Sequence, residues 1–358
     1  MNIDFPRETK LCSSSSSIIH TASPVFTTQL LSIQQTATLY SITTSQHPSP
    51  TMSTYLITQA TGQQSRWVIH HLLESGAKIH AVVRDIQKIP PILQNPAIAL
   101  FQGESKNYDD IFRAAQGCKG VFLNTVPFPG LEIPQAKTIV EASKAAGVET
   151  VVAATTQCAD RKEMWDDEET KATQLYYYFA SKAEVEDIVR GAGFQAYTIV
   201  RPAVLHHDFF LPGAYQNFPR LPTHGELDHL LNEGVKVPYT DTHDVGKYAA
   251  AALLDPAKFG GQEIDMGNEL LGIEEVRDLL SRVSGKRVGA VKRTEAELED
   301  LGISVFGQKF HLWANIKDLS SLPVVAKETQ AKFGIPFTSV EDAVKRDRAL
   351  LLACIPDN

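Results

Sequence analysis

The sequence predicts an α/β protein, a doubly wound parallel sheet with a smaller C-terminal lobe that would bind a substrate. Two features indicate this fold class. From Thr54 onward, short apolar segments of strand length alternate with longer segments whose apolar residues recur at helical spacing, as is typical of parallel sheets with crossover helices. The first apolar segment also leads directly into a short loop with the rhythm of a phosphate-binding turn, followed by a helix.

Six strands are expected in the first part of the chain, each built on a short run of apolar residues such as TYLIT or TVVAAT. Helices are expected between them, and Gly76 and Gly117 end two of these helices at the position where a left-handed residue closes the last turn. The expected strands are 54–58, 78–85, 97–103, 120–124, 150–155 and 196–202, and the expected helices are 65–76, 107–117, 131–146 and 171–191.

The regular alternation ends after Pro202. Residues 203–238 are rich in Pro, His and Phe and are expected to form a loop-dominated segment that covers a ligand. Further helices are expected at 243–256, 273–284 and 339–353, with a short strand at 287–292. We therefore expect residues 53–290 to form the main domain, and residues 291–358 to form C-terminal helices that pack on the substrate lobe.

The first 52 residues differ in composition from the rest. They include SSSSS at 13–17 and TTSQHPSP at 43–50 and show no helical or strand period, so a disordered, Ser/Thr-rich extension is expected over 1–52. This composition also suits a mitochondrial transit peptide, although Arg7 is the only arginine in the stretch. A cytoplasmic location is expected, with mitochondrial targeting as the alternative, and Met52 offers an alternative start.

Charge and composition exclude several classes of partner. The net charge of -8 argues against direct binding of nucleic acid, which needs a basic surface. No apolar run reaches the roughly 18 residues that a transmembrane helix needs, so no membrane is expected. The four cysteines lie far apart, which suits a reducing compartment and predicts neither a disulfide framework nor a zinc site.

His206, His207 and Asp208 resemble a set of metal ligands. Adjacent histidines on an extended segment point in opposite directions, however, and no second ligand pair in the sequence has a suitable spacing. No metal is therefore expected.

The loop at 59–65 has the spacing of a dinucleotide-binding turn but only one of its three glycines. In the pattern G-x-x-G-x-x-G the positions are Gln59, Gly62 and Ser65. The middle glycine lets the backbone approach the phosphates, and Ser65 is small enough for the helix to pack closely on the strand. Gln59 must form the tight turn without the conformational freedom of glycine. By itself the loop is also compatible with a strand-to-helix turn that binds no ligand.

Arg84 ends the second strand, at the position that distinguishes NAD from NADP. An acid at this position accepts a hydrogen bond from the 2′-hydroxyl of the ribose, whereas an arginine pairs with a 2′-phosphate. Lys88 lies four residues further on and adds a second positive charge. Both side chains favour NADP (NADPH) as the cofactor, and the alternative is a solvated charge at the end of a strand.

Several segments together resemble the NmrA-like family, atypical members of the short-chain dehydrogenase/reductase superfamily. They are ITQATGQQSRWVIHHLLESGAKIHAVVRD at 57–85, FQGES at 101–105, GVFLNT at 120–125, SKAEVEDIVR at 181–190, YTIVRPA at 197–203 and HDVGKYAAAALLDP at 243–256. The resemblance covers residues 54–290, about two-thirds of the chain. It implies a Rossmann fold, a preference for NADP, and either oxidoreductase activity or a cofactor-sensing regulatory role.

The resemblance also implies cofactor contacts at the carboxyl ends of strands, where open α/β sheets bind ligands. The residues concerned are Gln59, Ala60, Thr61, Gly62, Gln63 and Gln64 in the first loop, Arg84, Lys88 and Glu104 after the second and third strands, Asn124 and Thr125 after the fourth, then Lys182, Leu205, His206, His207 and Asp208.

Tyr178 and Lys182 form a Y-x-x-x-K pair. Residues four apart share one face of a helix, so both side chains are expected to reach one pocket. A nearby ammonium lowers the pKa of a phenol and suits proton transfer to a carbonyl oxygen, and Lys182 also suits the nicotinamide ribose. Of the two hydroxyls after the fifth strand, Thr155 and Thr156, we select Thr156 as a third catalytic residue, although it lies 22 residues before Tyr178. The alternative for Tyr178 is an aromatic helix face that packs into the core.

Two functions of different classes follow. The first is an NADP-dependent oxidoreductase that reduces or oxidises a small organic carbonyl or enone, with a role in secondary metabolism suggested by the resemblance alone. The second is a non-catalytic, NADP-sensing regulator that binds a protein partner. The Y-x-x-x-K pair favours the enzyme, whereas the single glycine of the loop and the missing serine after the fifth strand favour the regulator.

Overall fold

The computed structural model describes residues 52–303 and 306–357. The chain divides into two units, Met1–Ser49 and Pro50–Asn358, and all described residues belong to the second. The disordered extension expected over 1–52 therefore lies outside the described residues, apart from Met52 at its end. No described helix is both long and apolar enough to cross a membrane.

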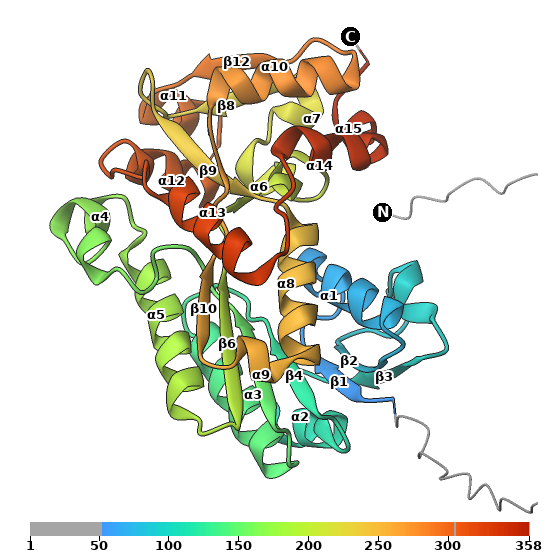
Figure 1. Ribbon diagram of the computed structural model, residues 1–358. Helices are drawn as coiled ribbons and strands as arrows, with labels where there is room; N and C mark the ends of the chain where they lie inside the picture. Colours follow the sequence, from blue (N-terminus) through green and yellow to red (C-terminus); the bar gives the residue numbers. More distant parts are fainter. Residues whose placement is uncertain (1–51, 304–305, 358) are drawn as a thin grey trace, which may run out of the picture. The chain divides into compact units, whose positions relative to one another are not determined.

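A seven-stranded parallel sheet forms the centre of this unit (Figure 1). Its strands are β1 (Thr54–Ile57), β2 (Lys78–Val83), β3 (Ile98–Gln102), β4 (Gly120–Leu123), β5 (Thr150–Ala154), β6 (Ala196–Arg201) and β10 (Gln262–Asp265). The order across the sheet is β10-β6-β5-β4-β1-β2-β3, so the chain starts in the middle and winds outward in both directions. The doubly wound fold class is confirmed.

The expectation of six strands misses β10, which is the seventh strand of the sheet. Its sequence QEID carries a single apolar residue, Ile264, which is buried and pairs with Val200 of β6. A strand at the edge of a sheet has only one neighbour and often carries charged residues. No apolar run therefore marks β10 in the sequence.

One face of the sheet is covered by helices α1 (Gln63–Glu74) and α8 (Thr242–Leu254). Successive strand residues point to opposite faces, so Tyr55 and Ile57 of β1 contact this layer whereas Leu56 contacts the other. The buried apolar residues of the two helices are Val68, Ile69 and Leu72 of α1, and Val245, Tyr248, Ala249, Ala250, Ala252 and Leu253 of α8.

Helices α1 and α8 pack closely because position 246 carries no side chain. A Cβ atom at Gly246 would lie 2.5 Å from the Cβ of Trp67 and 2.6 and 2.8 Å from the carbonyl carbon and oxygen of the same residue. Two of these three atoms belong to the backbone, so no rotation of a side chain relieves the overlap. The absence of a side chain at Gly246 thus lets α8 hold α1 against the sheet (Figure 1).

The opposite face is covered by α2 (Tyr108–Ala115), α3 (Glu132–Ala145) and α5 (Tyr176–Gly191), which bury Ile111, Ile139, Val185 and Val189 on it. The helix expected over 171–191 is divided into α4 (Glu168–Ala172) and α5. Between them Gln174 has a φ of +62°, which no helix accommodates. This break places Tyr176, Tyr177 and Tyr178 in the first turn of α5.

The segment 203–238 contains more regular structure than the expected loop. It forms β7 (Val204–Leu205), η3 (His206–Phe209), α6 (Ala214–Asn217), α7 (Leu221–His224), β8 (Glu226–His229) and the start of β9 (Lys236–Thr240). Strand β9 pairs with β7 in parallel and with β11 (Glu269–Gly272) in antiparallel orientation, and β8 pairs in parallel with β12 (Gly289–Lys292). Short 3-10 helices η1 (Pro91–Gln94) and η2 (Lys162–Met164) lie in earlier loops.

Most of the C-terminal helices share a core with the start of α5, namely α10 (Ile273–Ser284), α12 (Phe306–Ala314), α13 (Leu322–Phe333), α14 (Val340–Arg346) and α15 (Arg348–Cys354). Helix α9 (Pro256–Phe259) instead buries Phe259 in the layer of α1 and α8, and α11 (Glu295–Asp300) follows β12. Trp313 and Leu280 pack in one cluster with Phe179. Phe333 stacks on Phe259 with ring centroids 4.6 Å apart, and α13 contacts β10. Residues 291–358 therefore contact both the start of α5 and strand β10 of the main sheet.

The close contact at Gly246 predicts a large effect of a single methyl group. Gly246→Ala should lower the free energy of unfolding by about 1–3 kcal/mol, as overpacking does in other cores, because the new Cβ meets the backbone of Trp67. Urea unfolding measures this. Gly191→Ala is the matched control, since a Cβ at this helical glycine meets no atom within 4 Å, and it should leave stability unchanged or raise it by up to about 1 kcal/mol through helix propensity. Equal effects of the two variants would contradict the packing account.

Candidate functional site

The loop between Thr58 and Ser65 connects β1 to α1 at the carboxyl edge of the sheet. Gln59 has a φ of +49°, so the first position of the turn adopts the left-handed conformation that favours glycine. The N–H of Gly62 donates to the carbonyl of Gln59 at 2.8 Å and closes the turn. Helix α1 begins at Gln63, and no side chain caps its N-terminus. The first N–H groups of α1 are therefore not used by a side-chain cap, as suits the binding of an anion.

Ser65 ties this loop to the neighbouring strand. Its side chain is buried, and its hydroxyl donates to the carbonyl of Thr58 at 2.9 Å. The hydroxyl of Thr58 accepts from the backbone N–H of Asn124 at 2.9 Å, and the Asn124 amide donates to the Ser65 hydroxyl at 3.4 Å. Ser65 thus provides the close packing for which the third glycine of the pattern is normally needed, and adds hydrogen bonds to the end of β4.

A cavity of about 580 Å³ lies beside the loop, within the usual size range of small-molecule sites. Residues expected to contact the cofactor that line it are Thr61, Gly62, Gln63, Lys88, Leu205, His207 and Asp208. It is also lined by residues that the sequence analysis did not select, namely Arg66, Ile89, Pro90, Leu211, Pro212, Gly213 and Gln216. The position of Arg66 was predictable from the sequence, because a cation four residues after Gly62 lies one helical turn from the expected phosphate site.

The remaining expected contacts do not line this cavity. They are Gln59, Ala60, Gln64, Arg84, Glu104, Asn124, Thr125, Lys182 and His206. Arg84 is exposed directly after β2 and forms no ion pair with any residue in the described part of the chain. Nζ of Lys88 lies 3.1 Å from a carboxylate oxygen of Asp85. Of the two cations, Arg84 is therefore the one that forms no ion pair, whereas the charge of Lys88 is partly offset by Asp85.

Contrary to the expectation from the sequence, the side chains of His206 and His207 do not point in opposite directions. Their ring centroids lie 4.4 Å apart, because the two residues form a 3-10 turn, η3, and no extended segment. His206 is fully buried, and its Nε2 lies 2.9 Å from Asp347. Nδ1 of His207 lies 2.6 Å from the hydroxyl of Thr242. His206 is thus held by the C-terminal helices, whereas His207 lines the cavity.

Two ionisable groups of the cavity have displaced pKa values. Burial raises the pKa of Asp208 to about 7, so its carboxyl group is largely neutral below that pH. Burial, with the proximity of His206, lowers the pKa of His207 to about 3, so this imidazole is neutral at physiological pH. Asp208 is also close enough to Tyr178 for its charge to act on that phenol, which relates the cavity to the expected catalytic residues.

Thr156, Tyr178 and Lys182 lie together near the carboxyl end of β5. Thr156 is buried just beyond the strand, and its hydroxyl is near enough to the phenol of Tyr178 to lower the pKa of that group. Nζ of Lys182 lies 5.8 Å from the centroid of the Tyr178 ring. The structure therefore brings the expected catalytic residues into one group in spite of the long insertion between Thr156 and Tyr178.

The pKa of Tyr178 is raised overall, because burial outweighs the lowering effect that was expected of Lys182. The charge of Lys182 and the nearby Thr156 hydroxyl both lower the pKa, but they do not reverse the effect of burial. The ring also packs edge-to-face against Phe306 and Phe310, with centroids 5.3 and 5.2 Å away. One side of the Tyr178 ring thus packs into the aromatic core, as the alternative interpretation of this residue expected. A phenol with a raised pKa stays protonated at neutral pH and suits a proton donor.

Glu132 is a charged residue at this site that the sequence analysis missed. It is 1% exposed, and its carboxylate accepts from Nζ of Lys182 and from the Thr125 hydroxyl at 2.7 Å each, and from the Ser181 hydroxyl at 2.6 Å. Burial alone would raise the pKa of Glu132, but the Lys182 charge and these hydrogen bonds hold it below its usual value. In the sequence Glu132 resembles an ordinary acid in the first turn of a helix, 50 residues before its partner.

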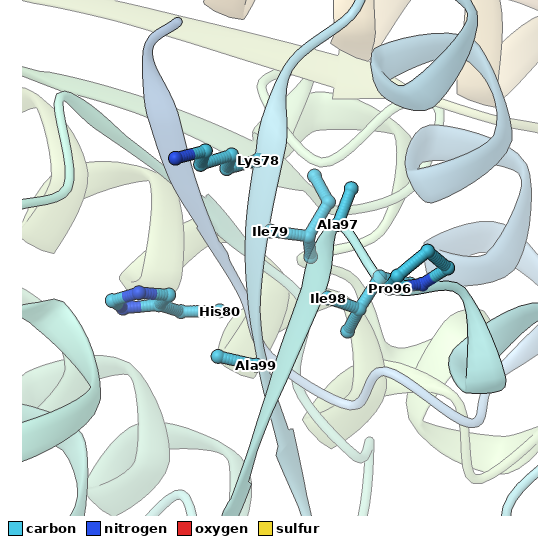
Figure 2. A pocket seen from close by; sticks show the side chains of 7 residues that line it. All are labelled: Lys78, Ile79, His80, Pro96, Ala97, Ile98 and Ala99. Atoms are coloured by element: carbon cyan, nitrogen blue, oxygen red, sulfur yellow. The ribbon is translucent and has the colours of Figure 1, made fainter.

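A smaller cavity of about 220 Å³ lies at the other end of the sheet (Figure 2). It is lined by Lys78, Ile79, His80, Pro96, Ala97, Ile98 and Ala99. These residues form the amino-terminal ends of β2 and β3 and the turn before β3, whereas the candidate site follows the carboxyl ends of the strands. Ligands of open parallel sheets bind at the carboxyl ends, so this cavity is not part of the candidate site.

Comparison with known families and proteins places these features in context. The model of the NmrA-like family matches residues 51–322. Among curated proteins, agroclavine dehydrogenase from Claviceps fusiformis is 31% identical over 105 residues, which make up 29% of this chain and 35% of that protein. The chain thus matches only about a third of the length of this relative.

Solved structures share the fold. An NADPH-dependent quinone oxidoreductase from Escherichia coli, complexed with NADPH, matches with a TM-score of 0.63 and 21% sequence identity. The match covers 82% of this chain and 99% of the chain of that enzyme. NmrA, a negative transcriptional regulator, in complex with NADP has a TM-score of 0.62 and 21% identity and covers 82% of this chain and 94% of its own. At such identities the likeness establishes the fold alone, which is shared by an enzyme and a regulator.

The buried pair of Glu132 and Lys182 predicts a strong and non-additive effect on stability. Glu132→Leu should lower the free energy of unfolding by about 3–5 kcal/mol, because it leaves the Lys182 ammonium buried without a partner. Adding Lys182→Met should recover at least about half of this loss, since two apolar side chains then replace two charges. Chemical denaturation of the three variants measures the cycle.

A second pair across the same helices serves as the control. Lys137 of α3 and Glu184 of α5 lie 3.3 Å apart with side chains 54% and 52% exposed, so Glu184→Ala should change stability by at most about 1 kcal/mol. A loss in Glu132→Leu as small as that in Glu184→Ala would show that the buried pair does not organise the site.

Proposed function

The chain belongs to the NmrA-like family, and from this premise we propose that it is an NADPH-dependent oxidoreductase that reduces a small organic carbonyl or enone. The observation that supports this most directly is the group of Thr156, Tyr178 and Lys182. The phenol of Tyr178 stays protonated at neutral pH, has a hydroxyl nearby, and its ring centroid lies 5.8 Å from an ammonium group. Such a group suits general-acid catalysis.

Binding of a dinucleotide is supported by the first loop. The N-terminus of α1 has no side-chain cap, and Gly62 lets the backbone come close to a diphosphate. The adjoining cavity of about 580 Å³ carries Arg66 and Lys88 on its wall, and both cations suit phosphates. The solved relatives named above hold NADPH and NADP, which is consistent with this part of the proposal.

A preference for NADPH over NADH is supported by Arg84. Its guanidinium follows β2, at the position where the adenosine ribose is read in this fold class. It is exposed and is not paired with an acid among the residues that the structure describes, so a 2′-phosphate meets no competing partner there. Lys88 contributes less, because Asp85 already lies 3.1 Å from it.

The proposed reaction divides into a hydride transfer and a proton transfer. NADPH, when bound, would supply a hydride to the carbonyl carbon or to the β-carbon of an enone. Tyr178 would donate its proton to the oxygen that gains negative charge, and the Thr156 hydroxyl near the phenol would polarise the substrate carbonyl. Lys182, held by Glu132, stabilises the phenolate that remains and orients the nicotinamide ribose.

The setting of the reaction belongs to the same proposal. A role in secondary metabolism is suggested by the family resemblance alone, and the match to agroclavine dehydrogenase is consistent with an oxidoreductase. The three cysteines in the described part of the chain are unpaired, which suits the reducing environment of the cytoplasm, where we propose that the protein acts.

A regulator that senses NADP and binds a protein partner is the second candidate, and one observation favours it. Lys182 is already engaged by Glu132, and Tyr178 packs against Phe306 and Phe310, so neither side chain needs a substrate to explain its position. NmrA shows that a regulator adopts this fold. The two candidates differ in what happens when the Tyr178 hydroxyl is removed.

Removal of the Tyr178 hydroxyl therefore tests the enzyme. Tyr178→Phe should lower turnover by roughly the 10²–10⁴-fold that a positioned acid contributes, while the affinity for NADPH stays unchanged. The measurement is NADPH oxidation over a panel of carbonyl compounds and enones. Tyr177→Phe is the matched control, because Tyr177 is 76% exposed on the same helix, and it should be silent. Absence of turnover in the wild type, or equal turnover in both variants, would count against the proposed roles.

The pKa of Asp208 predicts that binding depends on pH. Asp208 is neutral below its pKa of about 7 and negative above it, and it lines the same cavity as Gly62 and Lys88. NADPH affinity should thus fall by about three- to tenfold from pH 6.5 to 8.5, as expected for one added like charge at effective protein dielectric constants. His207 does not contribute, since it is neutral throughout this range.

The pH range and a variant isolate this effect. The 2′-phosphate, with a second pKa near 6, is already mostly charged above pH 6.5 and would in any case strengthen binding as the pH rises. Asp208→Asn should remove the pH dependence measured by fluorescence titration of NADPH. A wild-type affinity that is constant or rises over this range would show that Asp208 does not face the phosphates.

A further inference from the structure

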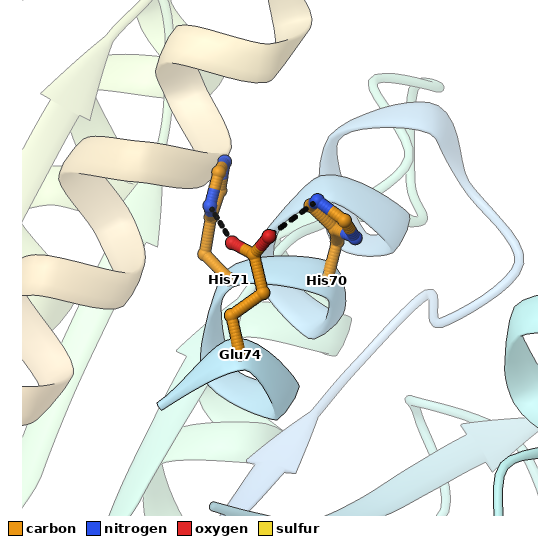
Figure 3. A group of neighbouring side chains, drawn as sticks. All are labelled: His70, His71 and Glu74. Carbon is orange, nitrogen blue, oxygen red and sulfur yellow. Dashed lines mark hydrogen bonds and ion pairs between the residues drawn. The ribbon is translucent and has the colours of Figure 1, made fainter. Parts of the chain in front are cut away.

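The last turns of α1 carry the sequence HHLLE, which places two imidazoles around one carboxylate (Figure 3). Nε2 of His70 lies 3.3 Å from one carboxylate oxygen of Glu74, and Nδ1 of His71 lies 3.0 Å from the other. Taken as one ligand atom from each residue, the three donors all lie within 4.8 Å of one another. This cluster is separate from the dinucleotide loop, which lies at the opposite end of the same helix.

We propose that His70, His71 and Glu74 bind a divalent transition-metal ion, for which Zn²⁺ is the natural occupant. Two imidazole nitrogens and one carboxylate oxygen are a donor set that zinc accepts with a water molecule in the fourth position. The same donors bind other late first-row ions, such as Co²⁺, Ni²⁺ and Cu²⁺. This inference does not depend on the proposed oxidoreductase activity.

The spacing of the donors fits the coordination geometry. Two ligands bound at about 2.0–2.1 Å in a tetrahedral zinc site are about 3.3–3.4 Å apart. Nε2 of His70 lies 3.3 Å from one carboxylate oxygen and Nδ1 of His71 lies 3.0 Å from the other, so each nitrogen–oxygen pair has about this separation. Binding of one ion by both imidazoles requires the carboxylate to turn or to coordinate through both oxygens. The side chains of His70 and Glu74 are 41% and 60% exposed, so they are able to move by the small amounts that coordination needs, and water reaches the fourth position.

The surroundings also favour a cation at this position. The cluster lies in the last turns of α1, where the carbonyl ends of the helix carry partial negative charge. Coordination through Nδ1 leaves the proton of His71 on Nε2, a buried atom without a hydrogen-bond partner among the described residues. The ring of His243 lies 4.7 Å from that of His71, and its Nδ1, which lies 3.8 Å from a carboxylate oxygen of Asp244, has no hydrogen-bond partner among the described residues. A small shift would join the two in the outer-shell hydrogen bond that metal-bound histidines usually make.

Two other clusters in the described part of the chain contain similar residue types, but cations of the protein already neutralise them. In the group of His206, His207 and Asp347, a guanidinium nitrogen of Arg346 lies 2.7 Å from Asp347 and 3.4 Å from Nε2 of His206.

In the group of Asp241, His243 and Asp244, Arg346 pairs with Asp241 at 2.6 Å and Lys247 pairs with Asp244 at 2.7 Å. By contrast, the described residues place no lysine or arginine in an ion pair with Glu74; its partners are the two histidines. Among the three clusters, only that of Glu74 is therefore free to receive a metal cation.

Trp67 provides a reporter for this site. Its ring centroid lies 5.3 Å from that of His70 and 6.4 Å from that of His71, so a paramagnetic ion bound between the histidines quenches its fluorescence. His70 lies eight residues after Gly62, which corresponds to about 12 Å along the helix. A bound metal is therefore expected to leave NADPH affinity unchanged within about threefold, because the phosphates are screened over that distance.

The test uses the full chain after treatment with a chelator. Calorimetric titration with Zn²⁺ should show one site per chain, and Co²⁺ should quench tryptophan fluorescence with the same stoichiometry. Glu74→Gln and His70→Ala should each weaken Zn²⁺ binding by at least about tenfold, which is the lower range of what even outer-shell changes cause. Trp67→Phe should abolish the Co²⁺-dependent quenching while Zn²⁺ still binds.

The controls separate this site from adventitious binding. His224→Ala removes an exposed histidine outside the cluster and should leave Zn²⁺ affinity unchanged, and thermal melts confirm that each variant is folded. Absence of Zn²⁺ binding at 1 mM or below, or equal affinity in the wild type, Glu74→Gln and His70→Ala, would overturn the proposal. NADPH titrations of the same samples test the dinucleotide site independently, so either proposal is able to fail alone.

Discussion

A buried ammonium group and a buried carboxylate, those of Lys182 and Glu132, meet between α5 and α3, and the candidate site is arranged around this contact. Neither charge is stable alone in an apolar interior, because desolvation of a single ion there costs several kcal/mol. The pair therefore fixes the relative position of two helices. Glu132 also accepts a hydrogen bond from Thr125 at the end of β4, so the pairing extends to the edge of the sheet. Tyr178, one turn before Lys182, is thereby placed beside Thr156.

This arrangement explains why the two candidate functions are close in structural terms. A site that binds a dinucleotide needs the loop around Gly62, the uncapped start of α1 and cations on the cavity wall, and all of these are independent of chemistry at Tyr178. Catalysis needs one more element, a proton donor that faces the substrate. We propose that the protonated phenol of Tyr178 meets that need, although its packing against Phe310 also suits a folded core. An enzyme and a regulator therefore differ here by the use of one hydroxyl group.

Much of the fold was predictable because local patterns determine it. Alternating apolar strands and helices locate β1 to β6, and the bounds of α10 agree with the expected 273–284. The sequence did not reveal β10, since an edge strand such as QEID needs no apolar run. The break at Gln174 carries neither glycine nor proline, the usual signals of a helix end.

The site was less predictable, because its contacts join residues that are distant in the chain. Glu132 and Lys182 are 50 residues apart, and no local pattern indicates that they meet. The sequence suggested that Lys182 lowers the pKa of Tyr178, but burial, which appears only with the fold, outweighs that charge. The predicted orientation of His206 and His207 was also wrong, because the prediction assumed an extended segment where the chain forms a 3-10 turn.

We propose that the loop around Gly62 holds NADPH with a single glycine, and calorimetric titration of the wild-type protein with NADPH and NADH is the direct test. We predict that NADPH binds, and that it binds at least about tenfold more tightly than NADH, because a charge-assisted contact of Arg84 with the 2′-phosphate is worth roughly 1.5–3 kcal/mol. Absence of NADPH binding at about millimolar ligand, a concentration that detects complexes as weak as about -4 kcal/mol, would contradict the account.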